Sequence, residues 1–310
     1  MSKTVARPRY GSRSAHLARL RALWPAAFPR RSSLVPRSSL LSPGTGAPFG
    51  SRRSSRHGGG SVRLIERHAR VYRHMWLVFA SGIAEPLFYL LSLGVGLGAL
   101  VGTVTGPGGQ QVPYREFVAP GLLAVSALNG AMFDSTFNVF FRLKYAKLYE
   151  SVLATPVGPA EVAIGEVGWA VLRGVVYAVA FTLVMTALGL VHSPWAVFAV
   201  PGAVLISFAV AAVGVACTTY MKSWQDFDYV LLIAVPMFLF SGTFYPLSVY
   251  PPVIARIVEW TPLYQGVVLL RDLVFGVLSP DLLWRAGYLA AMGVAGLALA
   301  SRRIARLLRV

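Results

Sequence analysis

The sequence predicts an all-α integral membrane protein with six membrane-spanning helices and an interfacial helix before the first of them. Three observations support this prediction. Only 13% of the 310 residues are charged, against about 25% in an ordinary soluble domain. Hydrophobic residues make up 55% of the chain, and the mean hydropathy is +0.60. From residue 62 onward, apolar runs of about twenty residues recur, which is the length that a helix needs to cross a bilayer.

The first sixty residues differ from the rest of the chain. They hold twelve Lys or Arg and no Asp or Glu, whereas residues 61–310 hold seventeen basic and twelve acidic residues. A segment rich in Arg, Ser, Pro and Gly cannot bury enough apolar surface to offset its ordering entropy. Residues 1–60 are therefore predicted to be a disordered, basic cytoplasmic tail. An organelle transit peptide has a similar composition, but an over-extended start or a non-essential tail is the preferred interpretation.

The formal net charge of +17 mostly reflects this tail. Nucleic-acid binding is a poor interpretation of the charge, because the tail offers no folded scaffold. The single cysteine, Cys217, excludes an internal disulfide, and the five histidines are scattered without the spacing of metal ligands. We expect no metal site.

Residues 62–76 are typical of an amphipathic helix at the membrane surface. One helical face is charged and carries Arg63, Glu66, Arg67, Arg70, Arg73 and His74. The opposite face is mainly apolar and carries Ile65, His68, Ala69, Tyr72, Met75 and Trp76. This helix leads directly into the first span.

The six spans are predicted at residues 76–101, 117–141, 169–191, 197–220, 228–246 and 282–300. The fifth contains Pro236, Gly242 and Pro246, and such breaks survive at membrane depth only where protein or a cavity satisfies the freed backbone. With the amino end inside, twelve basic residues lie on the inner flanks and four on the outer flanks. Positive charge gathers on the cytoplasmic side, so both termini are predicted to be cytoplasmic.

Four polar residues are placed at or near membrane depth: Glu85, Asn129, Asp134 and Asn138. Ionisable residues there are costly and face a protein interior or a water path. They could form a proton relay or contact substrate, or they could hydrogen-bond between helices. The structural interpretation is preferred, because the sequence shows no partner cation at matching depth. A proton-driven pump is therefore not expected.

Glycine patterns further limit the function. Gly94, Gly98 and Gly102 recur every four residues, which predicts close helix packing rather than a nucleotide-binding loop. The chain contains no GxxxxGK[ST] pattern and no nucleophile elbow. It is therefore expected to be no enzyme, and energy for active transport would come from another subunit.

The loop between the second and third spans contains the polar stretch YESVLATPVGPAEVAIGEVGW. A helix should end before Pro156, and Pro159 suits the first turn of a new short helix, which Gly165 would end or bend. The acids Glu161 and Glu166 favour a protein partner, because a helix on the inner leaflet usually presents cations to anionic lipid. An ordinary leaflet helix is the alternative.

The segment after the fifth span is apolar but interrupted by prolines. It has a short helical pattern from Pro262 to Phe275, which suggests a half-membrane hairpin on the outer side. Such a hairpin could be a gate or a structural cap.

The chain resembles permeases of the type-2 ABC exporter family in three stretches, which occur in the same order in that family. They are FRLKYAKLYESVLATPVGPAEVAIGEVGW, FLFSGTFYPLS and PLYQGVVLLRDL. The branch that they resemble most contains nodulation lipo-oligosaccharide exporters and daunorubicin-type drug exporters. The resemblance covers roughly residues 62–310 and implies one ABC type-2 transmembrane permease domain over residues 61–310. It also implies a dimer of permeases, expected to be a homodimer, with two copies of a separate ABC ATPase. ATP and Mg would bind that ATPase, and this chain would bind no cofactor.

The resemblance also implies functional segments. The ATPase-coupling helix matches Thr155, Pro156, Val157, Gly158, Pro159, Glu161, Val162, Ile164, Gly165 and Glu166. An outer re-entrant hairpin matches about residues 241–275. A substrate path between two permeases, lined by spans two and five, suggests Asn129, Phe133, Met237, Phe240 and Phe244.

The expected function is therefore that of a permease subunit of an ATP-driven exporter in the inner membrane of a bacterium. Its substrate would be a hydrophobic or amphipathic molecule such as a drug, lipid or lipo-oligosaccharide, as in multidrug efflux. One alternative is a membrane-embedded lipid-handling enzyme, which would need a polar catalytic cluster at one depth. Another is an assembly factor or a passive channel, and a channel would need a selectivity filter.

Overall fold

The computed structural model describes residues 59–72, 76–146, 148–153 and 157–307. All of them belong to one compact unit, residues 52–310. Apart from Gly59 and Gly60, the predicted disordered tail lies outside the described residues.

The described part of the chain is a bundle of helices, which confirms the predicted all-α class. The α-helices are α2 (Gly59–Tyr72), α3 (Trp76–Leu91), α4 (Gly98–Val101), α5 (Tyr114–Phe133), α6 (Val139–Lys144), α7 (Leu148–Leu153), α8 (Pro159–Ala187), α9 (Ala199–Thr218), α10 (Phe227–Leu239), α11 (Pro252–Glu259), α12 (Pro262–Phe275) and α13 (Asp281–Leu307). Two π-helical turns, Ser92–Leu97 and Asp134–Asn138, join α3 to α4 and α5 to α6. Sequence analysis did not predict a small antiparallel hairpin, in which β1 (Thr103–Thr105) pairs with β2 (Gln111–Pro113).

Among the described residues, five helical segments are long and apolar enough to cross a membrane. They are Ala84–Val101, Tyr114–Lys144, Pro159–Ala187, Pro194–Thr218 and Asp281–Leu307, and each overlaps a predicted span. The predicted fifth span is shorter than expected, because α10 has 13 residues and a helix needs about 20 to cross. Instead, α11 and α12 together supply a sixth candidate, bent by 81° as in a broken span or a re-entrant loop.

The helix α12 shows how local sequence sets the ends of this bent pair. The Thr261 hydroxyl accepts a hydrogen bond from the backbone N–H of Tyr264 (3.4 Å), and Pro262 occupies the first turn. Both features favour a helix start. The helix ends at Gly276, whose φ of 75° lies in the left-handed region that glycine tolerates.

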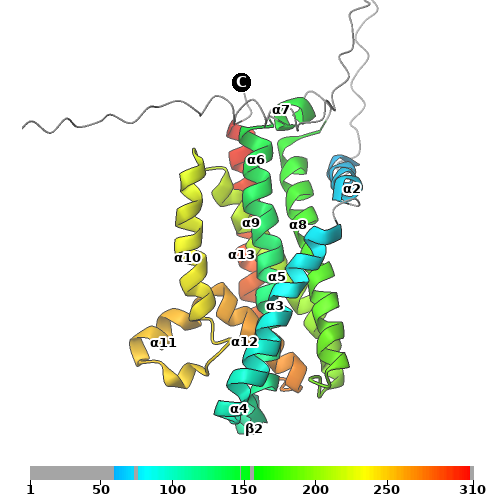
Figure 1. Cartoon of the computed structure of the whole chain (residues 1–310). Coiled ribbons are helices and arrows are strands. Elements are labelled where there is room, and N and C mark those ends of the chain that lie inside the picture. The colour runs from blue at the N-terminus through cyan, green and yellow to red at the C-terminus, as the bar shows by residue number, and fades with distance from the viewer. Residues whose placement is uncertain (1–58, 73–75, 147, 154–156, 308–310) are drawn as a thin grey trace, which may run out of the picture. The chain divides into compact units, whose positions relative to one another are not determined.

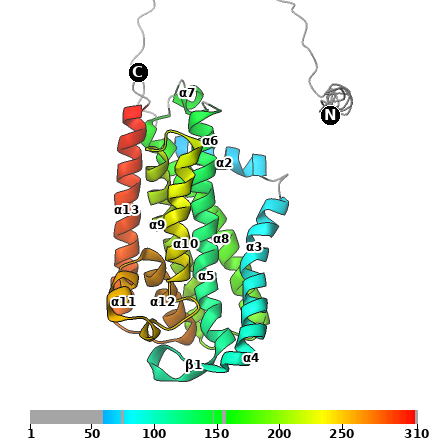
Figure 2. The ribbon, with the colours of Figure 1, turned by 60° about the vertical axis from the view of Figure 1, so that its left-hand side comes forward.

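The bundle has two distinct ends (Figures 1 and 2). One end carries α7 and the last turns of α13 and is called the α7 end. The other carries the β-hairpin, α11 and α12 and is called the hairpin end. The central helix is α9, which packs against α5, α8, α12 and α13. Small residues such as Ala211 and Ala212 are fully buried and let the helices approach closely.

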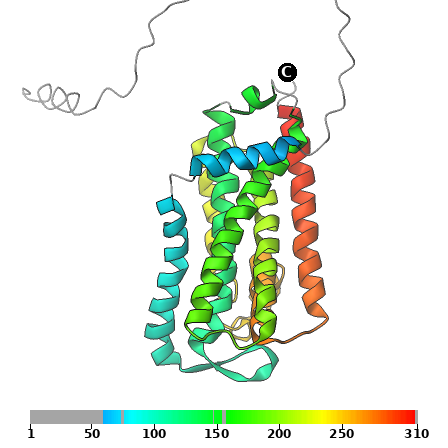
Figure 3. The same cartoon turned by 90° about the vertical axis from the view of Figure 1, so that its right-hand side faces the viewer.

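The helix α2 lies across α8 at the α7 end (Figure 3). A Cβ atom on Gly165 would be 3.0 Å from the Cβ of Leu64, so a side chain there would press on Leu64 where the two helices cross. The predicted break at Gly165 is therefore wrong. The helix α8 runs continuously from Pro159 to Ala187, and the predicted short helix and third span are one element.

The predicted packing role of the three spaced glycines is correct only in part. A Cβ on Gly94 would lie 3.3 Å from the Cβ of Arg115, so the turn after α3 packs closely on α5. Gly98 makes ordinary contacts. Gly102 has open space around it and a φ of 71°, and it ends α4 before β1 begins. Its role is conformational, which corrects the packing prediction for this residue.

Candidate functional site

Four charged side chains are buried where α2, α5–α6 and α8 meet, and we call them the charge network. They are Asp134, Arg142, Glu166 and Arg173, with exposed side-chain fractions of 1%, 14%, 1% and 5%. Two acids and two bases balance each other. Because an isolated charge in a protein interior is costly, this balance is what allows the network to be buried.

Arg142 bridges the two acids. Its Nη1 atom pairs with the Glu166 carboxylate, and its Nη2 atom lies 3.8 Å from Oδ1 of Asp134. Arg173 approaches the other side of Asp134, with 3.4 Å between Nη1 and Oδ2, and also donates to the Tyr177 hydroxyl at 3.0 Å. The network therefore links two predicted spans by direct ionic contacts.

Asp134 begins the π-helical turn that joins α5 to α6. Such turns are rare and occur often at functional sites. Asn138, at the end of the turn, donates its side-chain amide to Asp134. From α9, the hydroxyl of Thr218 lies 3.1 Å from the carbonyl oxygen of Ser135. These contacts fix the irregular turn between neighbouring helices.

Two further side chains connect the network to segments outside the spans. His68 on α2 places Nε2 3.5 Å from Oε1 of Glu166, and burial, aided by the charges of Arg142 and Arg67, lowers the pKa of His68 to about 3. His68 is therefore neutral at pH 7. Tyr149 on α7 is buried beside Glu166, and burial, aided by that carboxylate, holds its pKa well above the ordinary value.

The charge network corrects two predictions. Arg173 is the partner cation at the depth of Asp134 that the sequence was thought to lack. The sequence could have indicated this pair, because an arginine inside a predicted span usually pairs with a buried acid. Glu166 is 1% exposed. It is inaccessible to a partner, so the expectation that this acid contacts an ATPase is wrong.

The other residues of the predicted coupling helix are only partly at the surface. Thr155 and Pro156 lie outside the described residues. Val157, Gly158, Pro159 and Glu161 are half-buried. The backbone N–H of Gly158 donates to the Glu161 carboxylate (3.0 Å), so this acid caps α8. Val162 and Gly165 are buried, so they pack inward and cannot contact a partner. Ile164 is 46% exposed and remains available to one.

The predicted substrate-path residues do not form one cluster. Phe133 stacks on Phe137, with 5.0 Å between ring centroids, near the start of α10. Met237 and Phe244 pack against the main apolar core instead. Asn129 is half-buried on α5, and Phe240 is 42% exposed after α10. Their role in substrate transfer stays a prediction.

A buried arginine at the hairpin end was also missed. Arg271 on α12 donates to the carbonyl oxygens of Gly242 (2.8 Å) and Phe117 (3.3 Å). Its guanidinium carbon lies 3.8 Å from the centre of the Phe117 ring. Arg271 is one of the four basic residues that the sequence placed on the outer flanks, but it is buried and ties α12 to α5.

The described residues form a multi-pass helical bundle, with a bent helix pair at one end and buried charges at the other. Residues 62–275, more than half of the chain, match the family described as ABC-2 type transporter. The chain therefore belongs to the ABC-2 type transporter family, whose members work with an ABC ATPase.

Curated relatives are consistent with this assignment. The chain is 32% identical over 190 residues to nodulation protein J of Sinorhizobium fredii, covering 61% of this chain and 71% of the relative. It is 30% identical over 195 residues to nodulation protein J of Rhizobium leguminosarum bv. viciae, covering 63% and 73%. For the same-named protein of Bradyrhizobium diazoefficiens the identity is 27% over 229 residues, covering 72% and 86%.

Proposed function

We propose that this chain is the permease subunit of an ATP-driven exporter that moves a hydrophobic or amphipathic substrate out of the cytoplasm. Suitable substrates include drugs, lipids and lipo-oligosaccharides. The observation that supports this most strongly is the family match over residues 62–275. Because the sequence has no GxxxxGK[ST] pattern, ATP and Mg would bind a separate ABC ATPase subunit.

The proposed assembly contains two permease copies, as a homodimer, and two ATPase copies. It lies in the inner membrane of a bacterium with both termini in the cytoplasm. The distribution of cations supports this orientation, since α2, the end of α6 and the last turns of α13 all carry basic residues at the α7 end. The α7 end would therefore face the ATPase.

In the proposed mechanism, ATP closes the two ATPases and moves the segment from α7 to the start of α8. The charge network supports transmission of this movement, because Tyr149, Glu166 and Arg142 connect that segment to α5–α6. The spans would then alternate between inward-open and outward-open states. ATP can shift that equilibrium only if the ATPase makes different contacts in the two states.

The exposed part of the coupling segment gives a direct test. Ile164→Asp places a charge on a side chain that is 46% exposed at the α7 end. We expect it to reduce recovery of a co-expressed ABC ATPase by about tenfold, the effect of losing one contact worth about 1.4 kcal/mol. Recovery is measured by affinity purification of the permease from the membrane fraction.

Val249→Asp is the matched control, since Val249 is 68% exposed but lies between α10 and α11 at the opposite end. It should leave ATPase recovery unchanged. Equal recovery with wild type and Ile164→Asp would place the contact elsewhere. Failure of the wild-type permease to retain any ABC ATPase would contradict the proposed function itself.

A further inference from the structure

A pocket lies at the hairpin end, and the residues that line it have no role in the proposed transport mechanism. It has a volume of about 260 Å³ and lies between the bent pair α11–α12 and the first turns of α13. Its lining consists of Glu259, Trp260, Tyr264, Gln265, Trp284, Arg285 and Tyr288. Ligand pockets commonly measure about 300–1,000 Å³, so this one suits a single ring-sized group.

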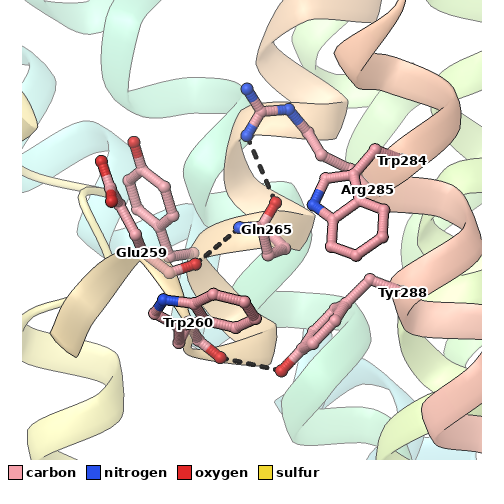
Figure 4. A pocket seen from close by; sticks show the side chains of 7 residues that line it. Glu259, Trp260, Gln265, Trp284, Arg285 and Tyr288 are labelled. Atoms are coloured by element: carbon pink, nitrogen blue, oxygen red, sulfur yellow. Dashed lines mark hydrogen bonds between the residues drawn. The ribbon is translucent and has the colours of Figure 1, made fainter. Parts of the chain in front are cut away.

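Among the aromatic side chains, Tyr288 is held in place, whereas Trp260 and Trp284 present exposed rings, at 68% and 61%. The Tyr288 hydroxyl donates to the backbone carbonyl of Trp260 at 2.8 Å, which joins α13 to the end of α11. Figure 4 shows the rings of Trp260, Trp284 and Tyr288 next to the side chain of Gln265. An aromatic belt would also place tryptophan and tyrosine at this depth. A belt does not explain the amide, guanidinium and carboxyl side chains that line the same pocket.

The polar groups offer both donors and acceptors. Arg285 donates from Nη1 to Oε1 of Gln265 (3.3 Å), and Gln265 donates from Nε2 to the carbonyl oxygen of Glu259 (2.5 Å). The Nε atom of Arg285 is buried and faces Oδ2 of Asp272 at 3.9 Å, beyond hydrogen-bond distance. The Glu259 carboxylate also lines the pocket and adds acceptors. A ligand with several hydroxyl groups could use Gln265, Glu259 and the outer nitrogens of Arg285.

The balance of charge selects a neutral ligand. The lining pairs one acid, Glu259, with one base, Arg285. An anionic headgroup would meet the acid Glu259 at the lining. A quaternary ammonium group, which aromatic rings otherwise attract, would meet the cation of Arg285.

We propose that this pocket binds one ring of a neutral carbohydrate. The weakly positive C–H groups on the apolar face of a sugar ring would stack on the negative faces of the tryptophan and tyrosine rings. The sugar hydroxyls would hydrogen-bond with Gln265, Arg285 and Glu259. This proposal rests on the proposed function in one respect only. The proposed orientation places the hairpin end, and with it the pocket, outside the cytoplasm.

The test measures binding by tryptophan fluorescence of the full chain in phosphatidylglycerol nanodiscs, prepared without sugar-based detergent. The probes are free maltotriose and, in a second arm, nanodiscs that contain glucosyl diacylglycerol. Binding of maltotriose identifies a free saccharide as a sufficient ligand, and binding only of the glycolipid identifies a lipid-anchored sugar. Inorganic phosphate and phosphocholine serve as the anionic and quaternary ammonium comparisons.

Trp284→Ala and Gln265→Ala should each weaken sugar binding by at least about tenfold. The first removes a stacking face, and the second removes a hydrogen-bonding group. Trp284→Phe retains an aromatic face and should stay within about threefold of wild type. Trp195→Phe changes an exposed tryptophan at the same end but outside the pocket and should have no effect.

The proposal is overturned if neither sugar probe binds, if Trp284→Ala and Gln265→Ala both bind as wild type does, or if phosphate or phosphocholine displaces the sugar. The binding assay needs no ATPase. If the wild-type protein retains the ATPase but binds no sugar, only the pocket assignment is refuted. If it binds sugar but retains no ATPase, only the proposed function is refuted.

Discussion

At the scale of single residues, Glu166 is the side chain whose role changes most between sequence and structure. A glutamate in a loop between spans suggests a surface acid. The structure places it 1% exposed, paired with Arg142 and close to His68 and Tyr149. A buried carboxylate with these partners positions four segments relative to one another, which is a structural requirement for passing motion between them.

Removing one member of this pair should be costly. We expect Glu166→Gln to lower the free energy of unfolding by about 3–5 kcal/mol, because Arg142 is then left buried without its main partner. The double variant Glu166→Leu with Arg142→Met should recover much of this loss, because neither buried charge remains. Thermal unfolding of the purified protein in nanodiscs measures both changes.

The exposed pair Glu66–Arg70 on α2 provides the control. Its side chains are 57% and 81% exposed and 3.5 Å apart, so Glu66→Gln should change stability by less than about 1 kcal/mol. If Glu166→Gln were as mild as Glu66→Gln, Glu166 would not be part of a buried ion pair.

His68 should make stability depend on pH. Its pKa is about 3 in the folded protein and near 6.5 when unfolded, so the unfolded state binds more protons between these values. The stability that neutral His68 contributes is complete above pH 6.5 and is lost as the pH falls towards 3, by at most about 1.4 kcal/mol per unit. Melting curves at pH 7.5 and 5.5 should show a larger drop for wild type than for His68→Gln. Equal drops would contradict the burial of a neutral His68.

At the scale of elements, the crossing of α2 over α8 decides whether the amphipathic helix stays attached. The crossing depends on Gly165, where a side chain would meet Leu64, and on Gly168, where a Cβ would lie 2.9 Å from Cδ1 of Ile65. The same helix brings His68 to the charge network. Attachment of α2 and integrity of the network should therefore fail together.

Gly165→Val should detach α2 and expose it to trypsin at Arg63, Arg67 and Arg70. The close contact at 3.0 Å leaves no space for a branched side chain, and overpacking of this kind costs about 1–3 kcal/mol. Cleavage rates are followed by mass spectrometry. Gly287→Ala, on an open face of α13, should leave cleavage unchanged. A Gly165→Val protein that resists trypsin as wild type does would contradict this crossing.

The bent pair α11–α12 depends on Arg271 in the same way. Arg271→Lys should destabilise the protein by about 1–3 kcal/mol, because an ammonium cannot reproduce the fork that reaches two carbonyl groups and covers the Phe117 ring. Arg256→Lys, on exposed α11, should be neutral. Thermal unfolding compares the two, and equal melting temperatures would refute the anchoring role of Arg271.

At the scale of the whole molecule, sequence patterns predicted the helical class and most spans. The bilayer alone requires long apolar runs, so these can be recognised without knowing any contact between helices. They failed where contacts between distant segments decide the structure. Gly165 resembled a helix breaker but is a crossing point for α2. Arg173 was overlooked because its partner Asp134 is 39 positions away in the sequence. The β-hairpin was missed because its strands have three residues each.

The central claim is the proposed function, in which this chain is a membrane transport subunit whose energy would come from a separate ABC ATPase. The most direct test is native mass spectrometry of the permease co-expressed with an ABC ATPase, followed by ATP hydrolysis of the same sample. The account predicts a complex of two permeases and two ATPases that hydrolyses ATP. A permease that remains free of every ABC ATPase offered in excess would contradict it.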